Sequence, residues 1–482
     1  MNKELKKFVA FCSLFLLDLF SFYISLFLAV NFRYLVDLLF PQRFPKNIFS
    51  FNYYFSIWWL PLIFVVFFSF EKLYFKKQPF WEEEKFILKS VFQSIVFIFF
   101  VITITEDYGS VSRLTIFFLG LIFFPIVSVI RFWGKRILNI LGIWSENVLI
   151  IGINEKARRI AESYIKEKEV GYSIVGFLTD DGVNKKRIKI LNREVEILGS
   201  VKNFKSIIKN LNVDNVIIAL ENYTQEEILK LSKEIQRIAK TVMIKPLISD
   251  IAQLNTEIHY LFFEKTLLIK INNNLKSLTN QIIKAVLDIL IVLVLSPFLL
   301  LFICIIAIAV KLTSKGPVFI KQERMGKGGK IFNCLKFRTM YENGDKILEE
   351  YLSKNSLAKK EWDDYRKLKT YDPRVTQIGK FLRKTSLDEL PQFINVLRGE
   401  MSVVGPRPYL IKEKRQIKEF LNIILLAKPG ITGLWQVSGR NDLKFLERAE
   451  LEAWYVENWS VWLDFIILIR TIFVIFKGNG AY

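Results

Sequence analysis

Residues 289–310 read ILIVLVLSPFLLLFICIIAIAV, an apolar run that is interrupted only by Ser296 and Pro297 at its middle. A membrane helix needs about 20 apolar residues, but a central proline removes a helix hydrogen bond and bends the axis. The basic residues that flank the run are Lys276 and Lys284 before it and Lys311, Lys315 and Lys321 after it. Because basic flanks favour the cytoplasmic side of a membrane, both ends are expected on one side. The sequence therefore predicts a re-entrant membrane helix over residues 276–312.

The alternative interpretation of this run is an ordinary kinked helix that crosses the membrane. A crossing would place the soluble segments before and after it on opposite sides. The basic residues at both ends favour the re-entrant form, in which the chain breaks at Ser296 and Pro297 and returns.

Four further apolar runs lie near residues 8–36, 53–70, 86–105 and 114–133. Each approaches the length of a membrane span, and basic residues adjoin the ends that would face the cytoplasm. The basic start MNKELKK is followed by a run that is too long for a signal peptide and lacks a small-residue cleavage site, so we expect a retained anchor. Residues 1–140 are thus predicted to form a four-helix transmembrane bundle. Asp18 and Arg33 are costly in lipid, and we expect them to face neighbouring helices or the interface.

The composition agrees with a membrane protein and excludes several kinds of site. Among 482 residues, 52% are hydrophobic and 15% are aromatic, values above the ordinary globular range. The net charge of +21 fits an anionic membrane face or an anionic substrate better than nucleic acid, since no nucleic-acid motif occurs. Cys12, Cys304 and Cys334 form no zinc or disulfide pattern. His259 is the only histidine, so a histidine triad or a histidine-rich metal site is not expected.

Residues 146–265 alternate short apolar strands with helical patterns, which predicts a parallel, Rossmann-like α/β domain. The turn after the first strand contains Gly152 but lacks the GxGxxG spacing that admits a pyrophosphate. A structural or regulatory module is therefore favoured over a dinucleotide-binding one. An oxidoreductase centred on this domain would need the complete glycine fingerprint and a Tyr-x-x-x-Lys dyad, and the sequence has neither here.

Residues 313–482 are polar enough for an α+β catalytic domain, and their apolar tail near 461–476 suits a helix at the membrane surface. Within them, RKTSLDELPQFINVLRGEMSVVGPRP (383–408) places Asp388 and Glu389 together at an expected helix start. Ser386 and Glu389 have the spacing of a capping box, which is the simplest interpretation of the two acids.

Cationic side chains favour a second interpretation of the acid pair. The candidates for phosphate contacts are Lys336, Arg338, Arg383, Arg407 and Arg440. Guanidinium groups match phosphate geometry. A carboxylate can attack phosphorus, and a second one can hold Mg²⁺ together with substrate phosphates.

Three long motifs closely resemble the bacterial sugar transferase family, the monotopic polyprenol-phosphate phosphoglycosyl transferases. They are GPVFIKQERMGKGGKIFNCLKFRTM (316–340), DPRVTQIGKFLRKTSLDELPQFINVLRGEMSVVGPRP (372–408) and KPGITGLWQVSGRN (428–441). The four N-terminal helices and the degenerate α/β module look like the long form of this family. The segments WYVENWSVW and GNGAY resemble its galactose-transferring members.

The resemblance implies transfer of a sugar-1-phosphate from a UDP-sugar to undecaprenyl phosphate, with release of UMP. This is the first membrane step of O-antigen, capsule or exopolysaccharide synthesis. Galactose is the expected sugar and glucose the alternative. Asp388 would be the nucleophile and Glu389 the Mg²⁺ ligand. The helix break would be Ser296 and Pro297, and Arg407 would contact phosphate.

The same resemblance implies a multi-pass protein of the bacterial inner membrane with its catalytic domain on the cytoplasmic face. Its partners would be undecaprenyl phosphate, the UDP-sugar and membrane lipid, without nucleic acid, and a homodimer is compatible with this. A non-enzymatic scaffold for polysaccharide assembly is the remaining alternative. It predicts that the neighbourhood of Asp388 is dispensable.

Overall fold

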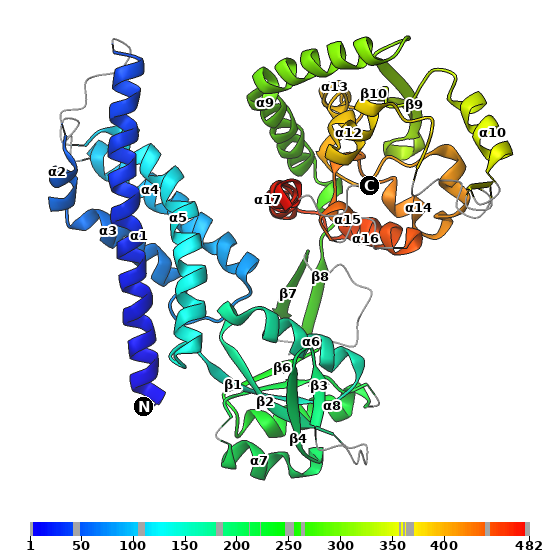
Figure 1. Cartoon of the computed structure of the whole chain (residues 1–482). Coiled ribbons are helices and arrows are strands. Elements are labelled where there is room, and N and C mark those ends of the chain that lie inside the picture. The colour runs from blue at the N-terminus through cyan, green and yellow to red at the C-terminus, as the bar shows by residue number, and fades with distance from the viewer. Residues whose placement is uncertain are drawn as a thin grey trace. The chain divides into compact units, whose positions relative to one another are not determined.

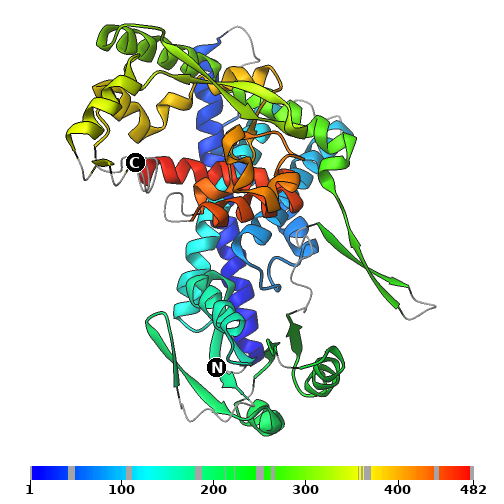
Figure 2. The same ribbon diagram turned by 90° about the vertical axis from the view of Figure 1, so that its right-hand side faces the viewer.

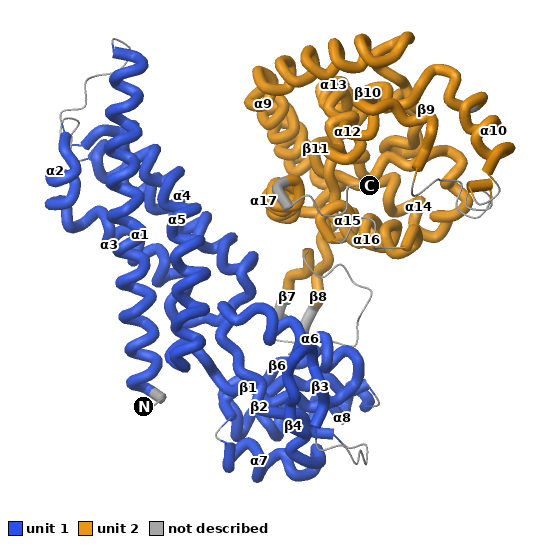
Figure 3. Tube along the Cα trace, in the orientation of Figure 1, with its two compact units in different colours: residues 1–249 blue, residues 250–482 orange. Residues whose placement is uncertain are grey.

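The computed structural model shows two compact units, residues 1–249 and 250–482, each with its own apolar core (Figure 3). The structure describes residues 3–41, 49–104, 111–179, 187–211, 213–221, 223–245, 255–261, 266–355, 358–359, 362, 371–438 and 444–477. The predicted membrane, α/β and catalytic parts are all present. The first two belong to the first unit.

The first unit begins with a helical bundle (Figures 1 and 2). Its helices are α1 (Lys3–Leu39), α2 (Phe51–Ser56), α3 (Trp59–Phe70), α4 (Phe80–Ile104) and α5 (Arg113–Ile140). Within the described residues, α1, α4 and α5 are long and apolar enough to span a membrane. The predicted second crossing is instead divided between α2 and α3. With 12 residues, α3 reaches only about 18 Å at 1.5 Å per residue.

A buried ion cluster joins three of these helices. Arg131 of α5 donates to both carboxylate oxygens of Asp18 of α1 at 2.7 and 2.9 Å, and to Glu83 of α4 at 2.7 Å. Lys135 lies 2.6 Å from the same Glu83 oxygen. Asp18 therefore faces neighbouring helices, as predicted. Removing one partner of such a cluster leaves an uncompensated buried charge, so the cluster specifies how the helices pair.

The α/β domain contains a six-stranded sheet in the order β3-β4-β2-β1-β5-β6. Its strands are β1 (Glu146–Ile151), β2 (Tyr172–Leu178), β3 (Arg187–Ile190), β4 (Arg193–Gly199), β5 (Asn215–Ile218) and β6 (Thr241–Ile244), and its helices are α6 (Glu155–Lys166), α7 (Phe204–Asn210) and α8 (Gln225–Gln236). All strand pairs are parallel except β3 with β4. Val148 and Ile150 of β1 pack with α6, whereas Leu149 and Ile151 pack with α7 and α8. The predicted Rossmann-like domain is thus confirmed.

Gly152 has a packing role in this sheet. A Cβ added there would lie 2.3 Å from the carbonyl oxygen of Ala219, and its φ is +115°. Asn154 caps α6 through a 2.8 Å bond from Ala157 N and also donates to the Ala219 carbonyl. The turn therefore allows the chain after β1 to approach the chain after β5. The N-terminus of α6 is capped by the side chain of Asn154.

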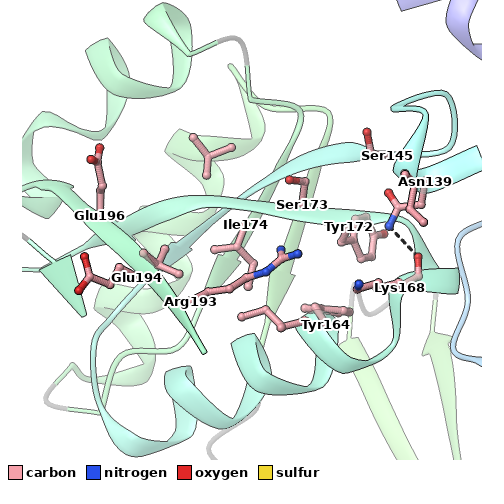
Figure 4. A pocket seen from close by; sticks show the side chains of 14 residues that line it. Asn139, Ser145, Tyr164, Lys168, Tyr172, Ser173, Ile174, Arg193, Glu194 and Glu196 are labelled. Carbon is pink, nitrogen blue, oxygen red and sulfur yellow. Dashed lines mark hydrogen bonds between the residues drawn. The ribbon is translucent and has the colours of Figure 1, made fainter. Parts of the chain in front are cut away.

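A cavity of about 690 Å³ lies in the α/β domain, at the amino ends of β1, β2 and β4 (Figure 4). Tyr164, Lys168, Tyr172 and Arg193 are among the residues that line it. In open α/β sheets, nucleotides bind outside the carboxyl ends of the strands. The position of the cavity, at the opposite end from Gly152, therefore does not favour a dinucleotide site.

The second unit starts with a hairpin of β7 (Thr256–Leu261) and β8 (Thr266–Ile271). The sequence placed its first strand, which contains His259, in the α/β domain. Asn255, just before β7, donates to the carbonyl oxygens of Glu457 and Trp459, each at 3.2 Å. These bonds tie the hairpin to the catalytic domain.

The long helix α9 (Leu278–Thr313) follows, with Pro297 inside it. Figure 1 shows α9 bent near its middle. In the arm before the bend, Lys284 bonds Asp464 at 2.5 Å, and Asp288 accepts from Val403 N at 2.9 Å. The arm after the bend packs Ile306 and Val310 against Phe337 and Leu382. Both arms therefore contact the same domain.

The part of the second unit that was predicted to be catalytic contains two short sheets. Its elements are β9 (Phe319–Met325), β10 (Ile331–Phe337), α10 (Gly344–Lys354), α12 (Gln377–Thr385), α13 (Gln392–Leu397), β11 (Ser402–Val404), α14 (Lys418–Ile424), β12 (Gly430–Thr432), α15 (Leu434–Val437), α16 (Phe445–Glu457) and α17 (Val461–Lys477). β9 and β10 pair antiparallel, and β11 and β12 pair parallel. The predicted tail helix is α17, which contacts α9, β11 and β12.

Candidate active site

Asp388 and Glu389 lie in a short 3-10 turn, Leu387–Glu389, between α12 and α13. Ser386 has a left-handed conformation with φ of 56° and ends α12, and its side chain forms no capping bond. The predicted capping box is therefore not formed. Pro391 is the residue before α13, whose first turn it suits. Two helices thus hold the acids in a tight connection, and simple capping does not explain why the acids are there.

Lys336 is the cation nearest to the acid pair. Its Nζ lies 2.6 Å from Glu389 Oε1 and 4.0 Å from Asp388 Oδ2. The side chain comes from the end of β10, whose partner strand is β9. The structure thus places Lys336 beside the acid pair, and its contact with a substrate phosphate stays a prediction.

Asn395 fixes the position of Lys336. Its side chain is fully buried, accepts from Leu335 N at 3.0 Å and donates to the carbonyl oxygen of Asn333 at 2.8 Å. It thus joins α13, which follows the acids, to the residues of β10 that precede Lys336. A buried polar side chain with all of these bonds made is costly to replace. The sequence offered no signal for Asn395 beyond a polar residue in an otherwise apolar helix.

The environment of Asp388 raises its pKa above that of an ordinary aspartate. Burial raises the pKa of Asp388 to about 6; Lys336 and Arg383 oppose the rise and Glu389 adds to it. Only 14% of its side chain is exposed, against 31% for Glu389. A carboxylate that is poorly hydrated yet close to a cation has the environment expected of a reactive group. The two neighbouring acids therefore have different surroundings.

Arg383 lies one helical turn before the acids, on α12. Its Nε donates to Thr339 Oγ1 at 2.9 Å. Burial lowers the pKa of Arg383, while the negative charge of Asp388 raises it. The close approach of α12 to Thr339 depends on Gly379, where a Cβ would lie 2.1 Å from the Thr339 carbonyl oxygen. Arg383 thus belongs to the electrostatic environment of Asp388, as the sequence predicted.

Arg338 lies elsewhere, with its guanidinium at the end of α9. It donates to the carbonyl oxygens of Lys315 and Ser314 at 2.6 and 2.9 Å and to Ser314 Oγ at 2.8 Å. The sequence placed Arg338 on the same face as Lys336. Its backbone N–H still pairs with the Val318 carbonyl oxygen at 2.9 Å, but its guanidinium is bound by the carbonyl oxygens at the end of α9. These bonds give Arg338 an anchoring role at the second arm of α9.

Arg407 extends from the loop Gly405–Pro408. Its NH2 lies 3.4 Å from Glu413, and its guanidinium carbon is 5.7 Å from the centre of the Tyr409 ring. Its backbone N–H donates to buried Glu452 at 2.6 Å. Burial raises the pKa of Glu452 to about 7. The backbone of the loop is therefore held by the buried Glu452, while the Arg407 guanidinium remains partly exposed. Arg440, the fifth predicted cation, lies outside the described residues.

The glycines of GPRP and PGITG allow two backbones to cross. A Cβ on Gly430 would lie 2.1 Å from Gly405 N, and one on Gly433 would lie 2.4 Å from the Gly405 carbonyl oxygen. Gly405 N donates to the carbonyl oxygen of Thr432 at 2.9 Å. The two motifs, distant in sequence, form one supporting structure for Arg407.

Arg324 is a charged residue near the site that the sequence did not single out. It is buried on β9 and donates to the carbonyl oxygen of Pro408 at 2.8 Å and to Gln322 at 2.7 Å. Burial and the charge of Arg407 lower the pKa of Arg324, whereas Glu413 and Glu389 raise it. Arg324 therefore connects the Arg407 loop with the acid pair. The sequence feature that could have indicated Arg324 is its spacing of two residues from Gln322 on β9, which places both side chains on one face of the strand.

Comparison with known proteins identifies two regions. Residues 279–478 match the family model described as bacterial sugar transferase, and residues 83–246 match one described as CoA-binding domain. An undecaprenyl-phosphate galactose phosphotransferase of Salmonella typhimurium is 34% identical over 85% of this chain and 84% of its own. A UDP-galactose-lipid carrier transferase of Erwinia amylovora is 34% identical over 85% of this chain and 84% of its own length. A UDP-glucose:undecaprenyl-phosphate glucose-1-phosphate transferase of Escherichia coli is 33% identical, with 70% and 68% covered.

The two neighbouring cations Lys336 and Arg338 are expected to differ in their effect on stability. Arg338→Met leaves the carbonyl oxygens of Ser314 and Lys315 without their donor, and we expect a loss of about 2 kcal/mol of unfolding free energy. Lys336→Met removes a partly exposed ion pair, and we expect a loss below about 1 kcal/mol. Thermal unfolding of the two purified full-length variants in one detergent measures the difference. The reverse order of stabilities would contradict the assignment of Arg338 as an anchor.

Proposed function

The chain belongs to the bacterial sugar transferase family, and on this premise we propose that it transfers a hexose-1-phosphate from a UDP-sugar to undecaprenyl phosphate. The products are UMP and undecaprenyl-diphospho-sugar, the first membrane intermediate of a bacterial polysaccharide. The observation that carries this proposal is the buried Asp388 carboxylate, whose nearest charged neighbours are Lys336, Arg383 and Glu389. It lies in the domain that also binds both arms of α9.

In the first half-reaction, a carboxylate oxygen of Asp388 attacks the β-phosphorus of the UDP-sugar. A bond forms between this oxygen and phosphorus, and the bond from phosphorus to the oxygen bridging the two phosphates breaks. UMP leaves with the electron pair, and the hexose phosphate remains on Asp388 as an acyl phosphate. Lys336 and Arg383 supply positive charge near the phosphoryl oxygens, and Arg407 is available to bind the diphosphate.

In the second half-reaction, a phosphate oxygen of undecaprenyl phosphate attacks the same phosphorus. The bond to Asp388 breaks, its carboxylate is restored, and the lipid diphosphate is released. The poor hydration of Asp388, with 14% of its side chain exposed, helps here because it limits access of water to the acyl phosphate. The second step thus requires the lipid phosphate to come to the position that UMP has left.

Glu389 is the residue we assign to Mg²⁺. Its carboxylate is partly exposed; Oε1 accepts from Lys336, and Oε2 accepts no hydrogen bond from the described residues. Mg²⁺ commonly binds through one or two carboxylates and completes its shell with substrate phosphates and water, so a single acid beside a diphosphate site fits this ion. When bound, the ion would neutralise charge on the diphosphate. Lys336 would keep the carboxylate oriented.

The bend of α9 supports a re-entrant position in the membrane. A straight helix of 36 residues would be about 54 Å long and would separate its ends by more than a bilayer core. Here both ends contact one domain, while Val294, Phe298 and Leu301 near the bend are 58–73% exposed. We infer that the apolar bend enters the bilayer and that the domain stays on the cytoplasmic face, next to the lipid phosphate.

Galactose is the sugar we propose, with glucose as the alternative. The names of the Salmonella typhimurium and Erwinia amylovora relatives specify galactose, and that of the Escherichia coli relative specifies glucose. The first two cover more of this chain, which favours galactose.

The nucleophile assignment predicts the effect of two isosteric substitutions. Asp388→Asn should abolish UMP release, because an amide is not a nucleophile toward phosphorus. Glu389→Gln should reduce it by at least about 100-fold, as expected for the loss of a metal ligand or its partner. UMP is measured with purified protein in nanodiscs that contain undecaprenyl phosphate. Glu350→Gln, which alters an exposed ion pair on α10, is the control and should retain full activity. Full activity of Asp388→Asn would contradict the covalent mechanism, and no UMP release from the unmodified protein would support the scaffold alternative.

The raised pKa of Asp388 predicts an acid limb in the first half-reaction. Asp388 attacks only when ionised. The rate of the UMP burst, measured without lipid acceptor, should therefore fall about tenfold per pH unit below pH 6 and level off above it. Omitting the acceptor removes titration of the lipid phosphate from the measurement. Lys336 lowers the pKa of Asp388, so Lys336→Met should move the midpoint to higher pH. A profile flat from pH 5 to 8 in the unmodified protein would exclude Asp388 as the titrating nucleophile.

The sugar is tested with a panel of UDP-sugars under one set of conditions. We expect UDP-galactose to give the highest kcat/KM, since the pocket must bind its hydroxyl groups with satisfied hydrogen bonds and rejects a misplaced hydroxyl. UDP-glucose, its 4-epimer, is the matched comparison. A preference for UDP-glucose would reverse the assignment of the sugar and leave the transfer chemistry intact.

A further inference from the structure

The first unit contains a second cavity, of about 200 Å³, that we call the lysine pocket. It is lined by residues from the start of α1, the α3–α4 connection, the α5–β1 connection and the α/β domain. Its four cationic side chains are Lys6, Lys7, Lys77 and Lys240. Three distant parts of the sequence thus bring lysines to one small cavity.

Two of these lysines donate to backbone carbonyls. Lys6 Nζ lies 2.8 Å from the carbonyl oxygen of Ser145, and Lys77 Nζ lies 2.5 Å from that of Trp144. Lys77 Nζ is also 3.9 Å from the centre of the Trp144 ring. Neither lysine has a carboxylate of a described residue within salt-bridge distance. Both amino groups are held in place by the α5–β1 connection.

Acidic groups near the pocket offset only part of its positive charge. Glu146 and Asp214 belong to the lining. Glu146 already accepts from Asn215 at 3.0 Å. Outside the lining, Glu4 lies 2.7 Å from Lys7. Four lysines therefore face three acids, and Lys7 already has its carboxylate partner in Glu4, which leaves Lys6 and Lys240 as the cations best placed for an added anion.

The pKa of Lys77 responds to burial and to the other lysines around the pocket. Burial lowers the pKa of Lys77 to about 7; Glu146 opposes this effect, while Lys135, Lys6 and Lys240 add to it. An anion in the pocket would stabilise the charged form and raise this pKa.

We propose that the lysine pocket binds a phosphate group, supplied by the headgroup of an anionic phospholipid. The lining includes the first turns of α1 and the connection before α4, so the pocket lies where apolar helices end and phospholipid headgroups begin. Phe75, a lining residue, and Phe8, next to the lining residue Lys7, are 68% and 63% exposed and are suited to contact acyl chains. Basic pockets at the cytoplasmic ends of membrane helices bind such headgroups through their phosphates. A soluble phosphate would satisfy the same lysines.

The test uses the full-length protein in nanodiscs of phosphatidylcholine that contain about 10% phosphatidylglycerol as the anionic lipid. Native mass spectrometry counts the phosphatidylglycerol molecules that remain bound after release from the disc. The variant Lys6→Gln/Lys240→Gln removes two charges but retains side chains that donate hydrogen bonds. We expect its retention of phosphatidylglycerol to fall roughly tenfold. Lys202→Gln/Lys209→Gln removes two exposed lysines outside the lining and should retain as much as the unmodified protein.

A second arm distinguishes lipid from soluble phosphate. Thermal unfolding in neutral detergent is measured with inorganic phosphate and with short-chain phosphatidylglycerol, at equal ionic strength. Stabilisation by phosphatidylglycerol that disappears in the pocket variant supports the lipid source. Stabilisation by inorganic phosphate alone, with the same loss, would reassign the site to a soluble anion. Equal retention and equal stabilisation in both double variants would overturn the proposal. The second arm also reports on folding, because a variant that does not fold shows no cooperative transition.

Discussion

Asp464 is the group on which the arrangement of the second unit depends. Three donors meet at its carboxylate: Lys284 from α9 at 2.5 Å, Tyr455 from α16 at 2.6 Å and the Trp459 indole at 3.1 Å. Tyr455 and Trp459 are 1% exposed. Because a buried charge is tolerated only when it is paired and hydrogen-bonded, this network allows little variation in how the first arm of α9 meets the domain.

The consequences of this network extend to the site. Lys284 also donates to the carbonyl oxygen of Val404, next to Gly405 and the loop that carries Arg407. At the other arm, Arg338 binds the end of α9, and it follows directly on β10, which carries Lys336. The two attachments of α9 are thus a few residues away from the cations around Asp388. The two arms of α9 and the Asp388 carboxylate are therefore held by neighbouring parts of one domain.

Much of this could be predicted from the sequence, because it depends on local pattern. Apolar runs, the interruption at Pro297 and alternating strands and helices gave the order of the parts. The acid pair is adjacent in the chain and was visible directly, whereas Lys336, on another element, was one of five cations that the sequence offered as candidates. Two predictions about single residues differ from the structure, each for its own structural reason. Ser386 does not cap a helix because its backbone is left-handed at the end of α12. Arg338 lies away from the acids because its guanidinium binds the carbonyl oxygens of Ser314 and Lys315, which are distant in the sequence. The roles of Asp464, Asn395 and Arg324 depend on partners that only tertiary structure brings near.

The account is tested most directly by the mass of the protein after mixing with UDP-galactose and Mg²⁺ in the absence of undecaprenyl phosphate. Acid quenching and peptide mapping locate any added hexose phosphate. The account predicts this addition on the peptide that contains Asp388, its absence in Asp388→Asn, and its loss when undecaprenyl phosphate is supplied. Release of UMP only when acceptor is present, with Asp388 unmodified throughout, would contradict it and indicate direct transfer between the two substrates.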